Sequence, residues 1–506
     1  MRLKYKIMEE KDVTYNHVLK YTGIFGGVQG LNIGLGLVRT KLVALLLGPS
    51  GMGLASLFNT TVNMIFQATN LGLPFSAVRR ISELHQKGDQ SALAHYVKVV
   101  RGWTLLTALI GILVCVVIGP FLSHTTFAWG DHTLHFVLLA PAVGMLTITG
   151  GETAILKGVH RVGALAVIQV VSILAALVIS VPVYFFFGAS GIVPVIVLMA
   201  LATMIVTVRC SWRAVPLQLT GVRHIMGEGT GMIRLGVAYT LAIVIGSLTE
   251  LVIRSYLNVT GDLDILGLYN AGYMLTITYA GMVFSAMETD YFPRLSAVQG
   301  DDGAVNETVN RQTEVSLLLL SPMLVTFMVT LPVLIPLLFS LEFVPVIGMA
   351  QVTTLAMYLK VLTMPVAYVT LARGQALAYL ILESLYCVAL ILLIIFCYQR
   401  WGLYGTGVAV TLAYLFDFLI VIGYAYKKNG YRCSATVFRY ALVQVLLGLF
   451  SYITVCVLSG IAYWLVGGIL ILLSTCYSLR ILRRKTHLWQ ALMRRFRSST
   501  TQPVSD

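Results

Sequence analysis

Apolar runs of about 18 residues or more recur from one end of this 506-residue chain to the other. A helix needs about 20 apolar residues to cross the hydrocarbon core of a bilayer, so each run is long enough for one crossing. Only 11% of the residues are charged, whereas about 25% are charged in a soluble domain. The runs also lack the alternation of apolar and polar residues that a transmembrane barrel requires. The sequence therefore predicts an all-α polytopic membrane protein.

We expect about 14 transmembrane helices. The first twelve form an N-terminal lobe, residues 1–222, and a C-terminal lobe, residues 223–432, with six spans each. Two further spans lie in residues 433–482, and residues 483–506 form a basic cytoplasmic tail. The expected spans are centred near Leu31, Phe66, Ile110, Val143, Leu174, Met199, Ile245, Leu275, Met323, Tyr358, Leu390, Tyr414, Leu447 and Leu470.

The distribution of Lys and Arg predicts the orientation of the chain. With the N-terminus on the inner side, 30 of the 35 Lys and Arg residues fall in inner segments and one, Arg400, falls in an outer loop. Positive residues accumulate on the cytoplasmic side of membrane proteins, so both ends of the chain are expected in the cytoplasm. The net charge of +14 is then mostly an orientation signal. We expect contacts with membrane lipids and no nucleic-acid partner.

The two predicted lobes repeat each other at an offset of 214 to 216 residues. Because each repeat holds an even number of spans, both halves should point the same way, related by a pseudo-two-fold axis along the membrane normal. A cavity at their interface would suit alternating access. The matching pairs are "VRT" (38–40) with "IRS" (253–255), "GLA" (53–55) with "GLY" (267–269), "RISEL" (80–84) with "RLSAV" (294–298), Lys157-Gly158 with Arg373-Gly374, and Gly188/Gly191 with Gly402/Gly405.

Several signatures of catalytic and metal sites are missing from the sequence. No Walker A, GxSxG or HExxH motif occurs. The seven Cys are scattered without a CxxC pair, which favours small core residues over disulfides or metal ligands. His124, His132 and His135 share one outer loop, but Asp131 is the only acid beside them, which argues against a metal site. We therefore expect neither an enzyme nor a cofactor.

Five stretches carry a resemblance to a known family: "KLVALLLGPSGMGLASLFNTT" (41–61), "LKGVHRVGAL" (156–165), "LVIRSYL" (251–257), "YFPRLS" (291–296) and "YLKVLTMPVAYVTLARGQALAYLILE" (358–383). The chain resembles the Wzx-type flippases for polyprenyl-diphosphate-linked oligosaccharides, which include the lipid III and O-antigen translocases. Their superfamily also contains multidrug extruders of the MATE type. The usual chain of the family has twelve spans, so the two extra spans are a departure that lipid II flippases share.

The resemblance implies that the protein moves an undecaprenyl-diphosphate-linked oligosaccharide from the inner to the outer leaflet of the bacterial cytoplasmic membrane. A polysaccharide polymerase and a chain-length regulator are the protein partners that such a role suggests. Coupling to a H⁺ gradient, a Na⁺ gradient or the membrane potential stays open. No covalent chemistry is implied.

Four cations lie within predicted spans, where an ammonium costs roughly 2.5–3.5 kcal/mol. A cavity lined by Lys and Arg would stabilise a diphosphate, and Arg can contact it through two hydrogen bonds. The family has a Lys at the position of Lys360, which implies that this side chain meets the diphosphate or an internal carboxylate. Arg39 and Arg254 are equivalent under the repeat, and Lys41 lies beside Arg39.

Each of these cations also has a structural interpretation. Arg39, Arg254 and Lys41 could extend to the outer interface, and Glu250, four residues before Arg254, could be its partner. The related pair Lys157 and Arg373 would capture the headgroup at the inner edge. The alternative for this pair is plain orientation of the chain.

Acidic residues within or beside spans are candidates for ion coupling. A buried carboxylate that exchanges a proton or binds Na⁺ could drive the two lobes. The candidates are Asp417, near the middle of its span, Glu383, which matches a Glu of the family, and Glu152. Glu288 is expected to be solvated near the inner edge of its span. Asp290 is expected to pair with Arg294, four residues later.

The sequence leaves two alternatives to the flippase function. A cation-coupled multidrug extruder of the MATE type would favour acids and aromatic residues in its cavity. A membrane glycan polymerase or ligase would expose a long outer loop, and none is present in the sequence.

Overall fold

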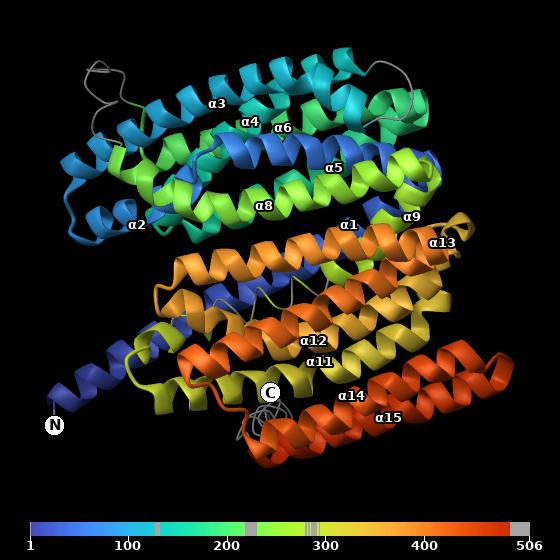
Figure 1. The fold of residues 1–506 in the computed structure, drawn as a ribbon. Helices are drawn as coiled ribbons and strands as arrows, with labels where there is room; N and C mark the ends of the chain where they lie inside the picture. The colour runs from blue at the N-terminus through green and yellow to red at the C-terminus, as the bar shows by residue number, and fades with distance from the viewer. Residues whose placement is uncertain are drawn as a thin grey trace, which may run out of the picture. The chain divides into compact units, whose positions relative to one another are not determined.

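The computed structural model describes residues 2–126, 132–217, 230–278, 281, 284, 291–292 and 294–485, and the regular elements in these ranges are all helices (Figure 1). In chain order the elements are α1 (Arg2–Thr69), α2 (Leu73–Gln86), α3 (Gln90–Thr126), α4 (Thr133–Gly158), α5 (Val162–Phe187), η1 (Gly188–Gly191), α6 (Ile192–Ala214), α8 (Thr230–Thr260), α9 (Leu263–Tyr273), η3 (Met274–Thr278), α11 (Asp302–Leu338), η4 (Leu341–Phe343), α12 (Val346–Ala372), α13 (Ala376–Asn429), α14 (Ala435–Val457) and α15 (Gly460–Lys485).

The helices are long and apolar, as the sequence predicts for a membrane protein. In the described part of the chain, nine helical segments are long and apolar enough to cross a bilayer. Two of them, Gly163–Ala214 and Leu377–Asn429, are long enough for two crossings each. Every predicted span centre lies within a helix. The all-α membrane fold is therefore confirmed, while the number fourteen stays a prediction.

Glycines divide the longest helical segments at the turns between expected spans. Gly48, followed by Pro49, has φ 62° and ψ −172° inside α1. Gly188 between α5 and α6 has φ 55° and ψ −134°, and Gly402 inside α13 has φ 56° and ψ −140°. A side chain rarely adopts such a conformation, so glycine is required there. Gly188 and Gly402 are one of the predicted repeat pairs, and their matching backbones support their equivalence.

The chain folds into two compact units. Unit 1 comprises Met1–Gly267 and Leu337–Glu342, and unit 2 comprises Leu268–Pro336 and Phe343–Asp506. In unit 1, α3 packs on α4, α4 on α6, and α8 on α1, α2 and α3. The span in α8 thus packs with unit 1, although the repeat assigns residues 223–432 to the C-terminal lobe. The boundary between the predicted lobes follows the sequence repeat, whereas the boundary between the two units follows the packing of the helices.

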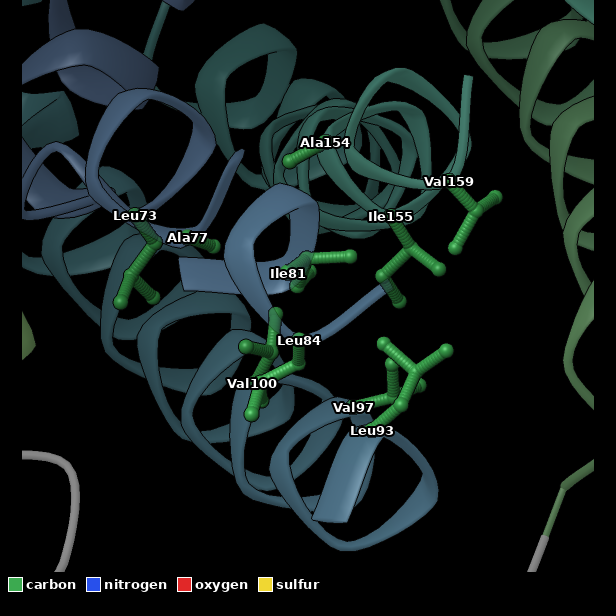
Figure 2. Close-up of a cluster of buried hydrophobic side chains, with 10 residues drawn as sticks. All are labelled: Leu73, Ala77, Ile81, Leu84, Leu93, Val97, Val100, Ala154, Ile155 and Val159. Atoms are coloured by element: carbon green, nitrogen blue, oxygen red, sulfur yellow. The ribbon is translucent and has the colours of Figure 1, made fainter. Parts of the chain in front are cut away.

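One apolar cluster in unit 1 shows how the short helix α2 is held. Leu73, Ala77, Ile81 and Leu84 recur at helical spacing on one face of α2 and are buried. Figure 2 shows them facing residues of α3 and α4. The cluster is completed by Leu93, Val97, Val100, Ala154, Ile155 and Val159.

In unit 2, α12 packs along α13, and α14 and α15 form a hairpin (Figure 1). A Cβ atom at Gly448 of α14 would lie 2.8 Å from the ring of Tyr358 of α12, so the absence of a side chain allows this close approach. Tyr463 of α15 donates a hydrogen bond of 2.7 Å to the carbonyl of Val329 of α11. These contacts attach the two extra helices to α11 and α12.

Candidate functional site

Lys360 lies in the second half of α12, on a helix whose other residues are mostly apolar and buried. Its side chain is half-buried, and five residues later Pro365 lacks a backbone N–H and cannot donate within the helix. The hydroxyl of Tyr291 donates a hydrogen bond of 2.6 Å to the carbonyl oxygen of Pro365. This stretch of α12 is therefore fixed by a contact from another helical segment.

Lys360 lines a cavity of about 290 Å³ within unit 2 together with Glu383 and Asp417. The two acids come from the two halves of α13, which Gly402 separates. Because both halves line the same cavity, the chain must turn back at Gly402. Lys360 interacts electrostatically with both carboxylates. The internal carboxylate that was expected near Lys360 is thus a pair of carboxylates.

Aromatic rings form much of the remaining wall of this cavity. The ammonium nitrogen of Lys360 lies 5.4 Å from the ring centroid of Phe284 and 5.7 Å from that of Tyr414. Each such cation–π contact contributes about 0.5–2 kcal/mol, depending on desolvation. The rings of Tyr386 and Tyr414 have centroids 5.3 Å apart. The rings and the two acids together offset the cost of placing an ammonium here. Tyr368 and Tyr379 also line the cavity.

The sequence indicated the three charged residues individually but not the tyrosines of this cavity. A local signal was present, because Tyr386 follows Glu383 by three residues and Tyr414 precedes Asp417 by three. Residues three apart lie on the same face of a helix. An acid that shares a face with a tyrosine inside an apolar span points to a common polar cavity.

Arg39 lines a separate cavity of about 480 Å³ within unit 1. Its Nε donates a hydrogen bond of 3.3 Å to Ser180 Oγ, and one terminal nitrogen lies 3.5 Å from Met199 Sδ. Among the residues that the structure describes, no carboxylate pairs with this half-buried guanidinium. The polar side chains that line the rest of the cavity are Asn59, Asn63, Tyr184 and Thr203.

Arg254, the repeat equivalent of Arg39, has a different environment. Its Nη1 lies 2.8 Å from Glu250 Oε2, and its Nε donates a hydrogen bond of 3.1 Å to Ser56 Oγ. Only 8% of the Arg254 side chain is exposed, whereas 45% of the Glu250 side chain is. The intrahelical pair that the sequence suggested is present, and it neutralises this arginine.

Glu152 of α4 forms a buried pair with Arg101 of α3. The two side chains are joined by contacts of 2.9 Å and 3.1 Å, and both are less than 10% exposed. Arg101 also donates to Ser211 Oγ and to the carbonyl oxygens of Val215 and Pro216. Glu152 thus holds an arginine that binds the C-terminal end of α6.

The remaining predicted cations lie outside both cavities. Arg373, at the C-terminal end of α12, pairs with Asp302 and lies 3.4 Å from the side-chain oxygen of Asn429. Lys157 is exposed and Lys41 is half-buried. The structure thus brings Lys360, Glu383 and Asp417 together, and it places the other candidates apart from them. Glu288, Asp290 and the tail after Lys485 lie outside the described residues.

No cluster of three or more metal-binding side chains is found among the described residues. The three histidines do not share a loop, since His124 lies in α3, His132 directly precedes α4 and His135 lies in α4. His132 and His135 form part of an aromatic group. His132 Nδ1 lies 3.3 Å from His135 Nδ1, and the His135 ring stacks on Phe58 with a centroid distance of 5.7 Å. Asp131 lies outside the described residues.

Residues 42–348 match the family model described as "Polysaccharide biosynthesis protein", which covers more than half of the chain. The chain belongs to this family of polysaccharide biosynthesis proteins, as the resemblance in its sequence indicated. No curated protein matches the chain.

Solved structures share the fold at low sequence identity. An inward-facing multidrug resistance MATE family transporter of the MOP superfamily has a TM-score of 0.67 and 15% identity, covering 78% of this chain and 94% of its own. The lipid II flippase MurJ, in an inward closed conformation, has a TM-score of 0.66 and 13% identity, covering 91% and 98%.

A third structure is a MOP superfamily transporter from Pyrococcus furiosus, with a TM-score of 0.56 and 13% identity, covering 80% of this chain and 93% of its own. All three are transporters or flippases by description, which agrees with the expectation that this chain is not an enzyme. The protein has the all-α fold of this class of membrane transporters.

Proposed function

We propose that this protein is a flippase that moves an undecaprenyl-diphosphate-linked oligosaccharide from the cytoplasmic to the periplasmic leaflet for surface polysaccharide assembly. The polysaccharide would be of the O-antigen or common-antigen type. Membership in a polysaccharide biosynthesis family supports this role, as does a fold shared with a lipid II flippase. The lobes formed by residues 1–222 and 223–432 would alternate access from the inner membrane's two sides, with both chain ends in the cytoplasm.

The observation that carries the proposal is the environment of Arg39. A guanidinium without a carboxylate partner among the described residues is costly within a membrane-spanning helix. A cavity of about 480 Å³ beside it gives an anion access. The two terminal nitrogens of an arginine can bind a phosphate through paired hydrogen bonds. We therefore assign the diphosphate to Arg39, with Asn59 and Asn63 as further hydrogen-bond donors.

The other predicted diphosphate ligands have supporting roles in this proposal. Lys41, half-buried two residues after Arg39, adds positive charge to the same helix. Lys157 attracts the headgroup at the inner edge of the membrane, and Arg373, which pairs with Asp302, attracts it less. Arg254 and Lys360 are already balanced by Glu250 and by the pair of Glu383 and Asp417, so they attract an anion less strongly.

The group of Lys360, Glu383 and Asp417 is the proposed coupling site. Two carboxylates and one ammonium carry a net charge of −1. Binding one proton or one Na⁺ ion would bring this net charge to zero, and releasing it would restore the charge. Glu152 contributes to this role less than was expected from the sequence, because Arg101 holds both of its oxygens.

The test of the proposed function is complementation of a strain that lacks its flippase for lipid-linked glycans. Wild-type protein should restore surface polysaccharide and clear the lipid-linked glycan that accumulates on the inner leaflet. Arg39→Met should abolish complementation at normal protein levels, and Arg39→Lys should restore it in part, because one ammonium cannot reproduce a two-point contact.

Arg311→Ala is the matched control. Arg311 is 72% exposed and pairs with Glu307 on the surface of α11, so its loss should leave complementation unchanged. Full complementation by Arg39→Met would contradict the assignment of the diphosphate. Failure of the wild-type protein with every lipid-linked glycan supplied would contradict the flippase.

A cation-coupled multidrug extruder of the MATE type is the second candidate. The unit 2 cavity favours it, because its two acids and several aromatic rings are what a drug-cation site requires. Lys360 in the same cavity opposes a second cation. The extruder predicts that expression raises resistance to ethidium and that Asp417→Asn removes this resistance. The flippase predicts no resistance to ethidium.

A further inference from the structure

The two carboxylates of the unit 2 cavity have unused hydrogen-bonding capacity. Glu383 and Asp417 both line the cavity. Among the described residues, no donor lies within hydrogen-bond distance of either carboxylate. A carboxylate normally accepts several hydrogen bonds when it is removed from bulk water. The cavity therefore presents acceptors to whatever fills it.

The charges in this cavity do not suit a diphosphate. The two carboxylates outnumber the one ammonium, and Lys360 already faces the rings of Phe284 and Tyr414. A diphosphate placed here would meet two acids at close range. An organic cation large enough to fill the cavity would lie against the ammonium of Lys360. A neutral ligand with many hydroxyl groups avoids both repulsions.

The aromatic rings supply the other half of the recognition. One face of a sugar ring carries C–H groups that pack against aromatic faces, while its hydroxyls donate to carboxylates and accept from ammonium groups. Tyr386 and Tyr414 lie beside Glu383 and Asp417 on the same helix faces. Flat aromatic surfaces next to acceptor oxygens are the combination that a sugar ring requires.

The size of the cavity agrees with this chemistry. Its volume of about 290 Å³ lies at the lower end of the range of ligand pockets, about 300–1,000 Å³. It has room for a single sugar ring.

We propose that the cavity formed by Lys360, Glu383, Asp417 and the surrounding tyrosines of unit 2 binds one sugar ring of the transported glycolipid. The inference rests on the proposed flippase function and deepens it. The contact with a sugar in unit 2 is then distinct from the contact that Arg39 makes with the diphosphate. The sugar, and not the diphosphate, determines which lipid-linked glycan is accepted.

The experiment compares two lipids that differ only in the sugar. The full-length protein in nanodiscs is titrated with undecaprenyl diphosphate and with undecaprenyl diphosphate carrying one N-acetylhexosamine, and binding is measured by native mass spectrometry. Tyr386→Leu and Asp417→Asn should each weaken binding of the glycosylated lipid by about fivefold to thirtyfold, as expected for the loss of one good contact. Binding of the bare diphosphate lipid should not change.

Matched variants separate recognition from folding. Tyr386→Phe keeps the ring and should retain most of the affinity for the glycosylated lipid. Glu383→Gln keeps the size of its side chain and should behave like Asp417→Asn. Tyr440→Leu removes a tyrosine that packs against Tyr477 and lines neither cavity, so it should bind both lipids as the wild type does. Arg39→Met should weaken both lipids equally.

The sugar site is wrong if the cavity variants weaken both lipids to the same extent, or if they leave both unchanged while the wild type binds both. Wild-type protein that binds neither lipid contradicts the flippase function and the sugar site with it. The two failures are thus distinguishable by the wild-type titration alone.

Discussion

Arg101 and Glu152 show what a charged residue inside this protein does when it is fully paired. The guanidinium of Arg101 is shared among a carboxylate, a hydroxyl and two carbonyl oxygens, so no part of it is left for a ligand. Lys360 is the opposite case, since it lies in a cavity that a ligand can enter. A charged residue whose hydrogen bonds are all made within the protein has a structural role. A charged residue that lines an open cavity can bind a ligand, wherever it lies in its span.

Glu152→Gln should destabilise the protein without changing its dependence on an ion gradient. Removing one partner of a buried ion pair typically costs about 3–5 kcal/mol, because the other charge stays unbalanced. Thermal unfolding in detergent should therefore begin at a lower temperature, and transport per folded molecule should keep its response to H⁺ and Na⁺. Replacing both Arg101 and Glu152 by Met should be less damaging than Glu152→Gln alone. A Glu152→Gln protein of normal stability that loses its gradient response would contradict this structural role.

Sequence alone identified individual charged residues but not all of their neighbours. The pair of Arg254 and Glu250 was predictable because residues four apart meet on one helix. The pair of Arg101 and Glu152 was not, because its partners lie 51 residues apart and meet only when α3 packs on α4. For the same reason, Glu383 and Asp417 were recognised separately, and their approach to Lys360 depends on the packing of α12 and α13.

At the scale of elements, the turns within the long helices depend on glycine. Gly402 combines φ 56° with ψ −140° inside α13, and no atom outside its own turn lies near where a Cβ would be. Its role is therefore conformational. The sequence paired Gly402 with Gly188 through the repeat, and the structure shows positive φ at both residues.

Gly402→Ala should destabilise the protein by about 1–3 kcal/mol, the cost of holding a non-glycine residue in such a conformation. Gly423→Ala is the control, since Gly423 lies within the helical second half of α13 and a Cβ would meet nothing within 4 Å. This control should be neutral or slightly stabilising. Thermal unfolding of the two variants measures the difference, and equal stability would show that Gly402 is not required at the turn.

The attachment of α14 depends on a missing side chain. Gly448→Val would place a Cβ atom 2.8 Å from the ring of Tyr358, which is fully buried. Overpacking of this kind costs about 1–3 kcal/mol, so the unfolding temperature should fall. Gly468→Val on α15 is the control, because a Cβ there meets nothing within 4 Å. If both variants unfold at the wild-type temperature, α14 does not pack closely on α12.

At the scale of the whole molecule, the orientation in the membrane is a prediction that rests on counting charges and not on packing. Thirty of the 35 Lys and Arg residues fall on one side of the predicted topology. The packing division is less predictable, since α8 lies in the predicted second repeat and packs in unit 1.

Labelling of single cysteines tests this orientation. In a variant whose native cysteines are replaced, Ser459→Cys in the turn between α14 and α15 should react with a membrane-impermeant maleimide added to cells with a permeabilised outer membrane. A variant that retains only the exposed Cys433 should react only after the inner membrane is opened. The reverse pattern would overturn the positive-inside assignment.

The division of α13 at Gly402 limits where residues can be inserted between Glu383 and Asp417. Glu383 and Asp417 reach one cavity from opposite halves of a bent helix, so their approach depends on the rotation of each half about its own axis. One inserted residue rotates everything beyond it by about 100° and carries a side chain to another face. Between these two acids, the chain can lengthen only by whole helical turns or at the bend itself.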